Sequence, residues 1–422
     1  MNSLKNMAIL LIFVLVFSAA GCWDQSEVEQ LALVRAIAID YLPEHEAPYL
    51  VTLAVNLPRN IAGGEGGSGN ADPTQLFTGV GASVELALEQ ISYSLPRRIY
   101  LAHTELLIVS QDLAKNHLSK VLDFVMRHPE IRASTYLMVS TGLAQKALTT
   151  SERIETTVSE EILGIVRHAE KTRATAAQQL FEFARDIANP GQEAYTSLLM
   201  VGPPLEKVLP ELKEENQPGG QAENGEGSAG GGGGGGGEEL EEILTLAGLA
   251  VFKEKKMVGI MDAIDTRGFL WFLGGTGQTV IEVHDPVDPK STVDILVYRI
   301  NSKLTPVIEN NKVSFRAEVE VEGDIRSWGI EIDFVTSEMV KKLNSGMAGV
   351  IKADMEKALS KMQELQADLV GFGAMLNRKD KKTFNRLQNR WGEVFSTLKV
   401  DITVKASIRR TGQHVRPIEA TQ

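Results

Sequence analysis

The chain has 422 residues, of which 43% are hydrophobic, and its formal net charge is −12 at pH 7. This length allows two or three domains of ordinary size, and the hydrophobic share is enough to fill their cores. The acidic balance repels the phosphates of nucleic acids and of anionic lipid headgroups, so the composition excludes nucleic acid as a partner.

The first 22 residues have the features of a lipoprotein signal. Lys5 precedes an unbroken apolar run, Met7–Phe17, which has the length of a signal-peptide core and is too short to cross a bilayer. The small residues Ser18–Gly21 precede Cys22, the only cysteine. We predict cleavage after Gly21 and lipidation of Cys22 by a diacylglycerol and an N-acyl chain, which together anchor a protein stably.

The remainder of the chain is predicted to lie in water, held to the membrane by this lipid alone. No later stretch approaches the ~20 apolar residues of a transmembrane helix. Removing residues 1–21 takes away Lys5 and no acidic residue, so the mature chain has a net charge of −13. A disulfide cannot form once Cys22 is acylated.

Residues 22–200 are predicted to form an α+β domain, with helices packed on a mixed sheet. Apolar residues at helical spacing predict a helix in 83–95 and a second helix that Asp112 can cap and that runs through Val125. The first two predicted strands form a hairpin around Pro43. The strands predicted from β-branched or alternating runs are Leu31–Asp40, Tyr49–Leu57, Glu105–Val109 and Thr135–Ser140.

Residues 201–243 are predicted to be a linker or an insertion at a domain boundary. The segment is rich in Pro, Gly and Glu, with Pro203-Pro204 near its start and an unbroken glycine run at Gly230–Gly237. Such a composition cannot bury enough apolar surface to offset the entropy of the chain. No Lys-Ser/Thr pair follows the glycines, so a phosphate-binding loop is not indicated.

Residues 244–289 are predicted to form a small β-rich middle domain. Leu246–Phe252 and Met257–Met261 bracket a charged tip and indicate a hairpin. The apolar residues of 267–275 are predicted to be core. Gly274–Gly277 is predicted to be a tight turn, because a strand-like run follows it where a nucleotide-binding loop would open a helix.

Residues 290–422 are predicted to form a C-terminal α+β domain with one long amphipathic helix. An apolar stripe at three- and four-residue spacing runs from Val340 to Phe372, which is typical of a core-facing helix. Ser337 is the predicted N-cap, and Gly371 and Gly373 are predicted to end the helix. The other predicted elements are the strands Val293–Ile300, Lys312–Val321 and Leu398–Ile408 and a helix through Leu387 and Trp391.

The sequence contains no pattern typical of a catalytic or metal site. His103 and His128 lack the His-x-x-x-His spacing of a metal site, and no Gly-x-Ser-x-Gly elbow is present. Asp40, Glu105 and Asp368 are lone acids that surface or helix-capping roles explain. We therefore predict no catalytic residue, no cofactor and no bound metal.

Several short motifs follow one another along the chain: Cys22-Trp23-Asp24 with Glu27, Ala36–Asp40, Arg98-Ile99-Tyr100 with His103, Arg127–Arg132, Gly248–Phe252, and Asp368–Gly373 with Trp391 and Phe395. Each motif alone is weak, but their order and coverage resemble the C-subunit lipoproteins of bacterial spore germinant receptors, the Ger(x)C family. The resemblance extends to Thr411-Gly412. The sequence departs from it in the glycine-rich linker and at Ala38, where glycine is expected.

This resemblance implies a three-domain, non-enzymatic α+β protein anchored on the outer face of the spore's inner membrane. It further implies integral membrane partners, a multi-spanning A subunit and a permease-like B subunit, which act with this subunit to trigger germination when nutrients appear. Arg127, Glu130 and Arg132 are candidate partner contacts, as is an exposed edge of the long helix after Ser337.

Two other classes of function stay open at this stage. A free-standing substrate-binding lipoprotein that feeds a transporter predicts two similar lobes around a cleft and direct binding of a small nutrient. A surface-anchored hydrolase predicts a cleft that contains a nucleophile or acids with perturbed pKa values.

Overall fold

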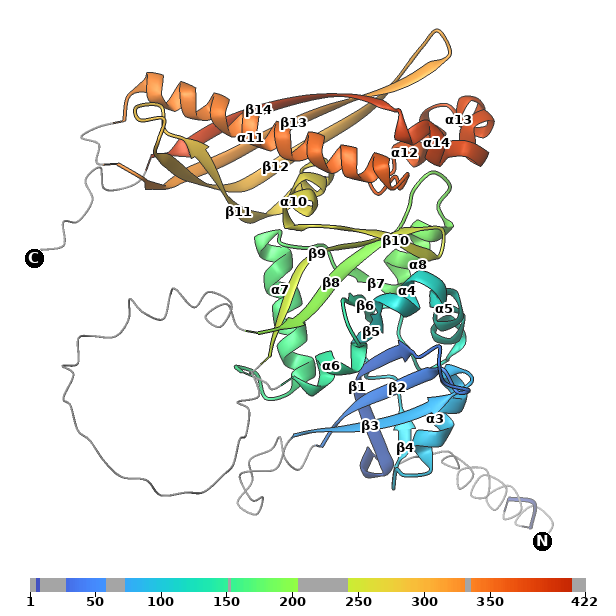
Figure 1. Cartoon of the computed structure of the whole chain (residues 1–422). Coiled ribbons are helices and arrows are strands. Elements are labelled where there is room, and N and C mark those ends of the chain that lie inside the picture. The colour runs from blue at the N-terminus through green and yellow to red at the C-terminus, as the bar shows by residue number, and fades with distance from the viewer. Residues whose placement is uncertain are drawn as a thin grey trace, which may run out of the picture.

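The computed structural model describes residues 5–7, 28–57, 73–150, 153–203, 242–330 and 335–411, and every statement below concerns these residues. Their strands form two sheets, one of ten strands and one of four (Figure 1). Helices pack on both sheets, which confirms the predicted α+β class. The predicted cleavage site and Cys22 lie outside the described residues, as does most of the predicted linker.

The ten-stranded sheet is mixed and consists of β1 (Leu31–Tyr41), β2 (Tyr49–Asn56), β3 (Thr74–Gly81), β4 (Arg98–Tyr100), β5 (Leu106–Ser110), β6 (Tyr136–Ser140), β7 (Gln178–Gln179), β8 (Tyr195–Gly202), β9 (Ile243–Lys253) and β10 (Lys256–Met261). Its order is β10-β9-β8-β6-β5-β1-β2-β3, with β4 beside β1 and β7 beside β6. The central strands β1, β5, β6 and β8 are parallel to one another. The predicted hairpins are confirmed as β1–β2 and β9–β10.

Helices cover both faces of this sheet, because alternate residues of its strands are buried on opposite sides. In β1, Ile37 and Ile39 face one core, and Ala36 and Ala38 face the other. Ala38 is fully buried, so a small residue suits this position whether it is alanine or glycine. The first side carries α3 (Val84–Ser92), α4 (Gln111–Asn116), α5 (Leu118–Arg127) and α8 (Leu180–Ala188), and the second carries α6 (Ala144–Thr149) and α7 (Val158–Thr172).

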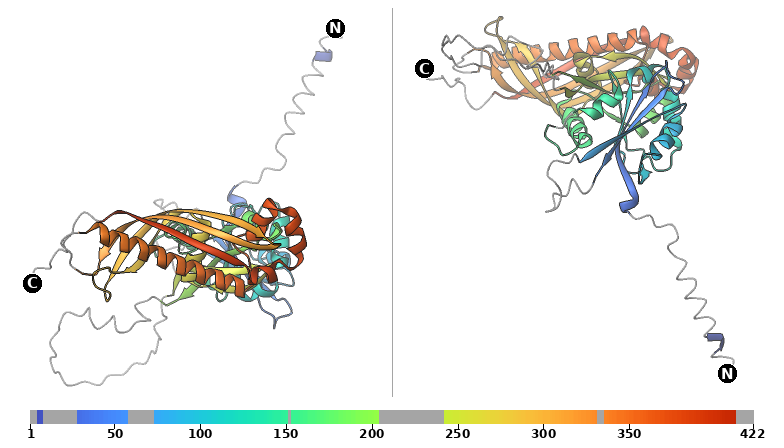
Figure 2. Two further views of the ribbon diagram at one scale, coloured as in Figure 1. Left: turned by 90° about the horizontal axis from the view of Figure 1, so that it is seen from above. Right: turned by 60° about the horizontal axis from the view of Figure 1, so that its bottom comes forward.

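The four-stranded sheet packs one face on two helices, α10 (Ala263–Leu273) and the long α11 (Ser337–Glu364). Figure 2 shows α11 running along the sheet. The sheet has the order β11-β12-β13-β14, and its last two strands are parallel. As predicted, alternate residues of the third strand, Phe315, Ala317, Val319 and Val321, are buried. The bounds are β11 (Gly275–His284), β12 (Thr292–Glu309), β13 (Lys312–Trp328) and β14 (Lys399–Arg410).

The long helix differs from its predicted bounds at both ends. Thr336, rather than Ser337, is the N-cap. The helix stops at Glu364 and not at the predicted glycines, because Gln366 has a left-handed φ of 53° that ends the helical path. Gly371 instead caps the next helix from a φ of 79°. The helices that follow are α12 (Phe372–Lys379), α13 (Lys381–Leu387), the 3-10 turn η3 (Gln388–Arg390) and α14 (Trp391–Ser396).

Two other predicted helices are divided. The helix predicted through Val125 is α4 and α5, separated at His117, and Ser110 rather than Asp112 occupies the N-cap position. The His117 ring stacks on Tyr41 with ring centres 3.6 Å apart, so a contact with the sheet fixes the break. The helix predicted through Leu387 and Trp391 is α13, η3 and α14. The predicted turn at the glycines after α10 is wrong, because Gly275 begins β11.

Residues 244–289, predicted to form a middle domain, contribute to both sheets. Strands β9 and β10 extend the ten-stranded sheet, whereas β11 opens the four-stranded one. The apolar residues predicted to be core are confirmed, since Phe269, Trp271 and Phe272 of α10 are almost fully buried. The division of the chain into independently folding domains stays a prediction.

The crossing of α10 and α11 depends on Gly268. A Cβ at this position would lie 2.1 Å from the carbonyl oxygen of Asp354. The same Asp354 accepts two hydrogen bonds from Arg267, at 2.8 and 3.1 Å, and one from Trp271 Nε1 at 3.2 Å. The two helices therefore meet backbone to backbone at a fixed register.

We expect Gly268→Ala to lower the free energy of unfolding by about 3 kcal/mol, because a methyl group there forces the two helix backbones apart. Gly349→Ala is the matched control, since a Cβ at Gly349 of α11 meets nothing within 4 Å. That change is expected to add up to about 1 kcal/mol through helix propensity. Urea unfolding of both variants measures the effects, and equal stabilities would show that the crossing tolerates a wider separation.

Candidate functional site

Asp368 connects the first turns of two helices, α12 and α14. Its Oδ1 accepts the backbone N–H groups of Gly371 and Phe372, at 2.8 and 3.0 Å. Its Oδ2 accepts the N–H of Gly373 at 2.8 Å and Nε1 of Trp391 at 3.0 Å. The first three donors lie at the start of α12, and Trp391 is the first residue of α14. The side chain thus has a capping role, which was one of the two roles, surface or capping, that the sequence left open.

The carboxyl of Asp368 is almost fully removed from water, with 1% of the residue exposed. Burial raises its pKa to about 6, although the four donors favour the charged form. Asp368 is therefore an acid whose pKa lies well above its ordinary range.

The turn after α8 presses against the start of α12. Gly191 O accepts the N–H of Ala374 at 3.0 Å. A Cβ on Gly191 would lie 2.7 Å from both the Gly373 carbonyl carbon and the Phe384 ring, and a Cβ on Gly373 would lie 2.6 Å from the Trp391 ring. Backbones this close leave no room for a side chain, so both positions require glycine. This contact, together with Asp368, is called the glycine joint below.

Glu193 ties the glycine joint to the turn between β9 and β10. Its N–H donates to the carbonyl oxygen of Asp368 at 2.9 Å, and its carboxylate accepts the N–H of Glu254 at 2.8 Å. Burial raises the pKa of Glu193. Beside it, Lys253 Nζ donates to Gln366 Oε1 at 2.9 Å. The two sheets are therefore connected by polar contacts as well as by packing.

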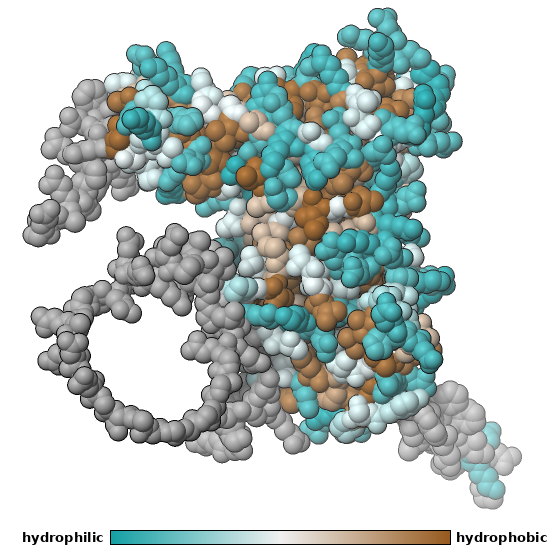
Figure 3. Space-filling model, viewed as in Figure 1, coloured by the Kyte–Doolittle hydropathy of each residue, from teal (hydrophilic) through white to brown (hydrophobic). Residues whose placement is uncertain are grey.

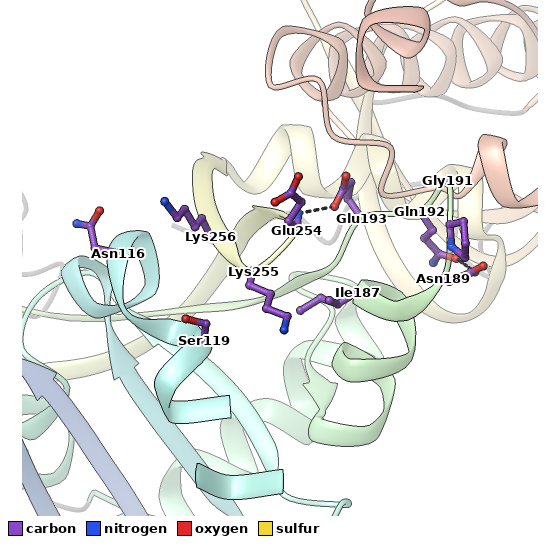
Figure 4. A pocket seen from close by; sticks show the side chains of 11 residues that line it. Asn116, Ser119, Ile187, Asn189, Gly191, Gln192, Glu193, Glu254, Lys255 and Lys256 are labelled. Atoms are coloured by element: carbon purple, nitrogen blue, oxygen red, sulfur yellow. Dashed lines mark hydrogen bonds between the residues drawn. The ribbon is translucent and has the colours of Figure 1, made fainter. Parts of the chain in front are cut away.

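A cavity of about 440 Å³ opens next to the glycine joint (Figure 4). This volume lies within the range of small-molecule sites. Its charged groups are two lysines and two glutamates, so it suits a small polar molecule that carries both charges. The cavity is lined by Asn116, Ser119, Ile187, Asn189, Pro190, Gly191, Gln192, Glu193, Glu254, Lys255 and Lys256.

A second connection between the sheets is made by Arg173, which follows α7. Its guanidinium donates to three carbonyl oxygens at the end of α10 and the start of β11, those of Leu270 (2.5 Å), Gly274 (3.1 Å) and Thr276 (3.2 Å). It also lies 5.9 Å from the centre of the Trp271 ring. Burial lowers the pKa of Arg173 to about 10. The cation thus neutralises the negative end of the α10 dipole.

Sequence reasoning missed Arg173, Gly191 and Glu193. No local pattern marks Arg173, because its partners lie about a hundred positions further along the chain. Gly191 carried a signal that went unused, since it follows Asn189-Pro190, a combination typical of a turn.

The candidate partner contacts lie at the end of α5 and on the loop that follows it. Glu130 accepts Arg98 at 2.5 Å and the N–H of Leu101 at 2.9 Å, so it braces this loop against β4. Arg127 is exposed and pairs with Asp123 at 2.9 Å. Arg132 is also exposed. The arginines are accessible, whereas Glu130 already has structural partners.

The other acids and histidines noted in the sequence have local roles. Asp40 accepts the N–H groups of Ala144 (2.6 Å) and Gln145 (3.0 Å) at the start of α6, and burial raises its pKa. Glu105 lies 2.5 Å from Arg35. The ring of His103 lies against Tyr100 and that of His128 against Phe124, so the two histidines do not converge.

Two further features are absent from the described residues. No group of three or more His, Cys, Asp or Glu side chains in this part of the chain is arranged to hold a metal ion. Among the helices that the structure describes, none has the length and apolar character to span a membrane.

Comparisons with known proteins give one consistent result. The family model described as "Spore germination protein N-terminal domain" matches residues 24–201, and "Spore germination B3/ GerAC like, C-terminal" matches residues 247–412. Spore germination protein KC of Bacillus subtilis (strain 168) is 24% identical over 98% of each chain. Spore germination protein B3 of the same organism is 22% identical over 93% of this chain and 95% of its own.

A solved structure shares the fold. The crystal structure of the GerBC protein superposes with a TM-score of 0.53 and covers 90% of this chain and 99% of its own, at 18% sequence identity. The interval between the two matched family segments, 202–246, includes nearly all of the predicted linker. The cavity beside the glycine joint is built from both segments, since Asn116 and Glu193 belong to the first and Lys255 to the second.

Proposed function

Because the chain belongs to the Ger(x)C family of spore germination proteins, we propose that it is the non-enzymatic C subunit of a nutrient receptor. In this proposal it acts with the integral membrane A and B subunits to trigger germination. The observation that carries the proposal is the ordered match of both family segments along nearly the whole chain.

The proposal includes anchoring by lipid on Cys22, at the outer face of the spore's inner membrane. Val28, the first residue of the described body, lies six positions after Cys22, so the connecting chain spans at most about 20 Å. The ten-stranded sheet is then held close to the headgroups, within reach of integral membrane partners.

The two sheets favour a receptor subunit over a free-standing substrate-binding lipoprotein. That alternative requires two similar lobes around a cleft, but here one sheet is mixed with ten strands and the other has four. The glycine joint and Arg173 tie the two sheets together at separate points. Because the two sheets are tied together, the protein is suited to transmitting a structural change from one partner to another. It is less suited to closing two lobes around a ligand.

The buried acids also support a structural role rather than a hydrolytic one. Among the described residues, Asp40 and Asp368 are the deeply buried carboxyls with raised pKa, and backbone N–H groups occupy both oxygens of each. An acid held this way is a cap and does not face a substrate.

We expect a mild-detergent pull-down of the tagged protein from inner membranes of dormant spores to recover two integral membrane proteins, one of them permease-like. Mass spectrometry identifies them, and an unrelated tagged lipoprotein is the control. Recovery of the tagged chain alone, or with an ATP-driven transporter, would contradict the receptor proposal and favour the substrate-binding alternative. Labelling with palmitate tests the anchor separately, since Cys22→Ala is expected to abolish incorporation.

A further inference from the structure

Residues 378–390 form a basic corner on the four-stranded side of the molecule. They cover the end of α12, all of α13 and the turn η3. Figure 3 shows hydrophilic residues over this part of the surface. The segment contains a single acid, Asp380, and six exposed cations, Arg378, Lys379, Lys381, Lys382, Arg386 and Arg390.

These cations have no close carboxylate partner in the described part of the chain, although Arg386 acts electrostatically on Asp380. None of the six forms an ion pair with an acid in the described part of the chain. Asp380 is occupied as the N-cap of α13, where it accepts the N–H of Lys382 at 3.0 Å and both the N–H and the hydroxyl of Thr383. The basic corner is therefore a net positive surface on a protein whose overall charge is −12.

The basic corner extends onto the neighbouring β12–β13 hairpin. Lys379 Nζ donates to the carbonyl oxygen of Pro306 at 2.8 Å, and Arg386 donates to Asn311 Oδ1 at 2.7 Å. A cavity of about 720 Å³ lies beside this contact. Its lining adds three more cations, Lys312, Arg316 and Lys399, against two acids, Glu309 and Asp401.

The surface chemistry of the basic corner does not suit nucleic acid. Single strands bind by stacking their bases on exposed aromatic rings. The two aromatic residues nearest the cations, Phe384 and Trp391, are buried, with 1% and 6% exposed. A cluster of four to eight exposed Lys and Arg residues is instead typical of a surface that binds anionic lipid, at about 1 kcal/mol for each residue.

We propose that the basic corner binds the anionic phospholipid headgroups of the membrane that carries the lipid anchor. This inference rests on the proposed function for the anchor at Cys22. Figure 1 places the start of β1, beside β4, at one end of the molecule and α13 at the other. With both ends on the membrane, the body lies along the bilayer instead of standing on its ten-stranded sheet.

Vesicle co-sedimentation tests the proposal with the mature chain, residues 22–422, carrying Cys22→Ala. This chain lacks the lipid and the signal peptide but keeps every residue of the three hydrophobic cores. We expect it to bind vesicles of phosphatidylglycerol mixed with phosphatidylcholine, and not vesicles of phosphatidylcholine alone. Molar salt should release it, because the screening length falls to about 3 Å.

A triple reversal, Lys381→Glu, Lys382→Glu and Arg390→Glu, is expected to weaken this binding at least about a hundredfold. The matched control reverses three exposed lysines of α11, Lys341, Lys342 and Lys352, and should bind nearly as well as the parent chain. Thermal melting checks that both variants are folded.

Two results would overturn the proposal: failure of the parent chain to bind phosphatidylglycerol, or equal losses in the triple variant and its control. Either result would indicate that the basic corner binds an acidic protein surface instead of lipid. A failure of palmitate labelling at Cys22 would overturn the anchor without changing vesicle binding, so the two proposals fail separately.

Discussion

Asp368→Ala is expected to lower the free energy of unfolding by at least about 4 kcal/mol, because it leaves four buried donors without an acceptor. These donors are the N–H groups of Gly371, Phe372 and Gly373 and Nε1 of Trp391. Asp368→Asn should cost less, since its carbonyl oxygen can retain two of the four bonds. Denaturant unfolding measures both, and a loss below about 1 kcal/mol in the alanine variant would contradict the capping role.

The same acid is expected to make stability depend on pH. The pKa of Asp368 is about 6 in the folded chain against an ordinary value of 3.8. Between these values the folded state binds more protons than the unfolded state, so stability falls as pH rises from about 4 to 6. The difference corresponds to about 3 kcal/mol, which is present below pH 4 and lost above pH 6.

Asp368→Asn removes this titration and serves as the control. We expect the stability advantage of the parent chain over the asparagine variant to be larger at pH 4 than at pH 7. Comparing the two chains cancels the contribution of Asp40, whose pKa burial also raises. The contribution of Glu193 cancels only in part, because its pKa is raised by burial and also by the charge of Asp368. A constant difference across this range would mean that Asp368 stays ionised in the folded protein.

Arg173→Met is expected to lower the free energy of unfolding by about 4 kcal/mol, because it leaves three carbonyl acceptors without their hydrogen-bond donor. The methionine keeps an apolar stem, but the carbonyl oxygens of Leu270, Gly274 and Thr276 lose their donor. Arg173→Lys should rescue only part of the loss, because an ammonium cannot span three acceptors as a planar guanidinium does.

Arg167→Met is the matched control for this change. Arg167 is exposed on α7, the helix that Arg173 follows, so its replacement is expected to change stability by less than about 0.5 kcal/mol. Calorimetry should also show whether the two sheets still unfold together in Arg173→Met. Equal stabilities of the two variants would show that packing alone connects α7 to α10.

Much of the fold follows from local sequence patterns, because a strand or helix that packs on a core must place apolar residues on its buried face. The alternation of Ala and Ile in 36–39 predicted a strand, and the structure packs the alanines and the isoleucines on opposite helical layers. The stripe after Thr336 predicted a long helix for the same reason. Its end was predicted wrongly, because helical spacing continues past Glu364 although the backbone turns at Gln366.

Only part of the glycine joint could be predicted from the sequence. For Asp368 the sequence offered a surface or a capping role, and the structure shows the capping role. Gly191 and Gly373 are distant in sequence, and nothing in either local stretch reveals that their backbones touch. Their requirement for glycine arises from the packing of one sheet against another, which a local pattern cannot encode.

Net charge does not describe how charge is distributed over the surface. Summed over the chain, the charge of −12 indicates repulsion from anionic lipid. The sum hides the basic corner, where six cations remain exposed because the single nearby acid, Asp380, is turned inward as a cap.

The sequence by itself determined the class of the fold, most of the strands, the long helix and the family, because each depends on periodicity or on the order of short motifs. It gave no prediction for strands β3, β4, β7 and β8. Only the tertiary structure decided how the two sheets are joined, which carboxyls are buried and where unpaired charge collects. These properties depend on contacts between residues far apart in the chain, for which burial and distance, rather than composition, set the energy.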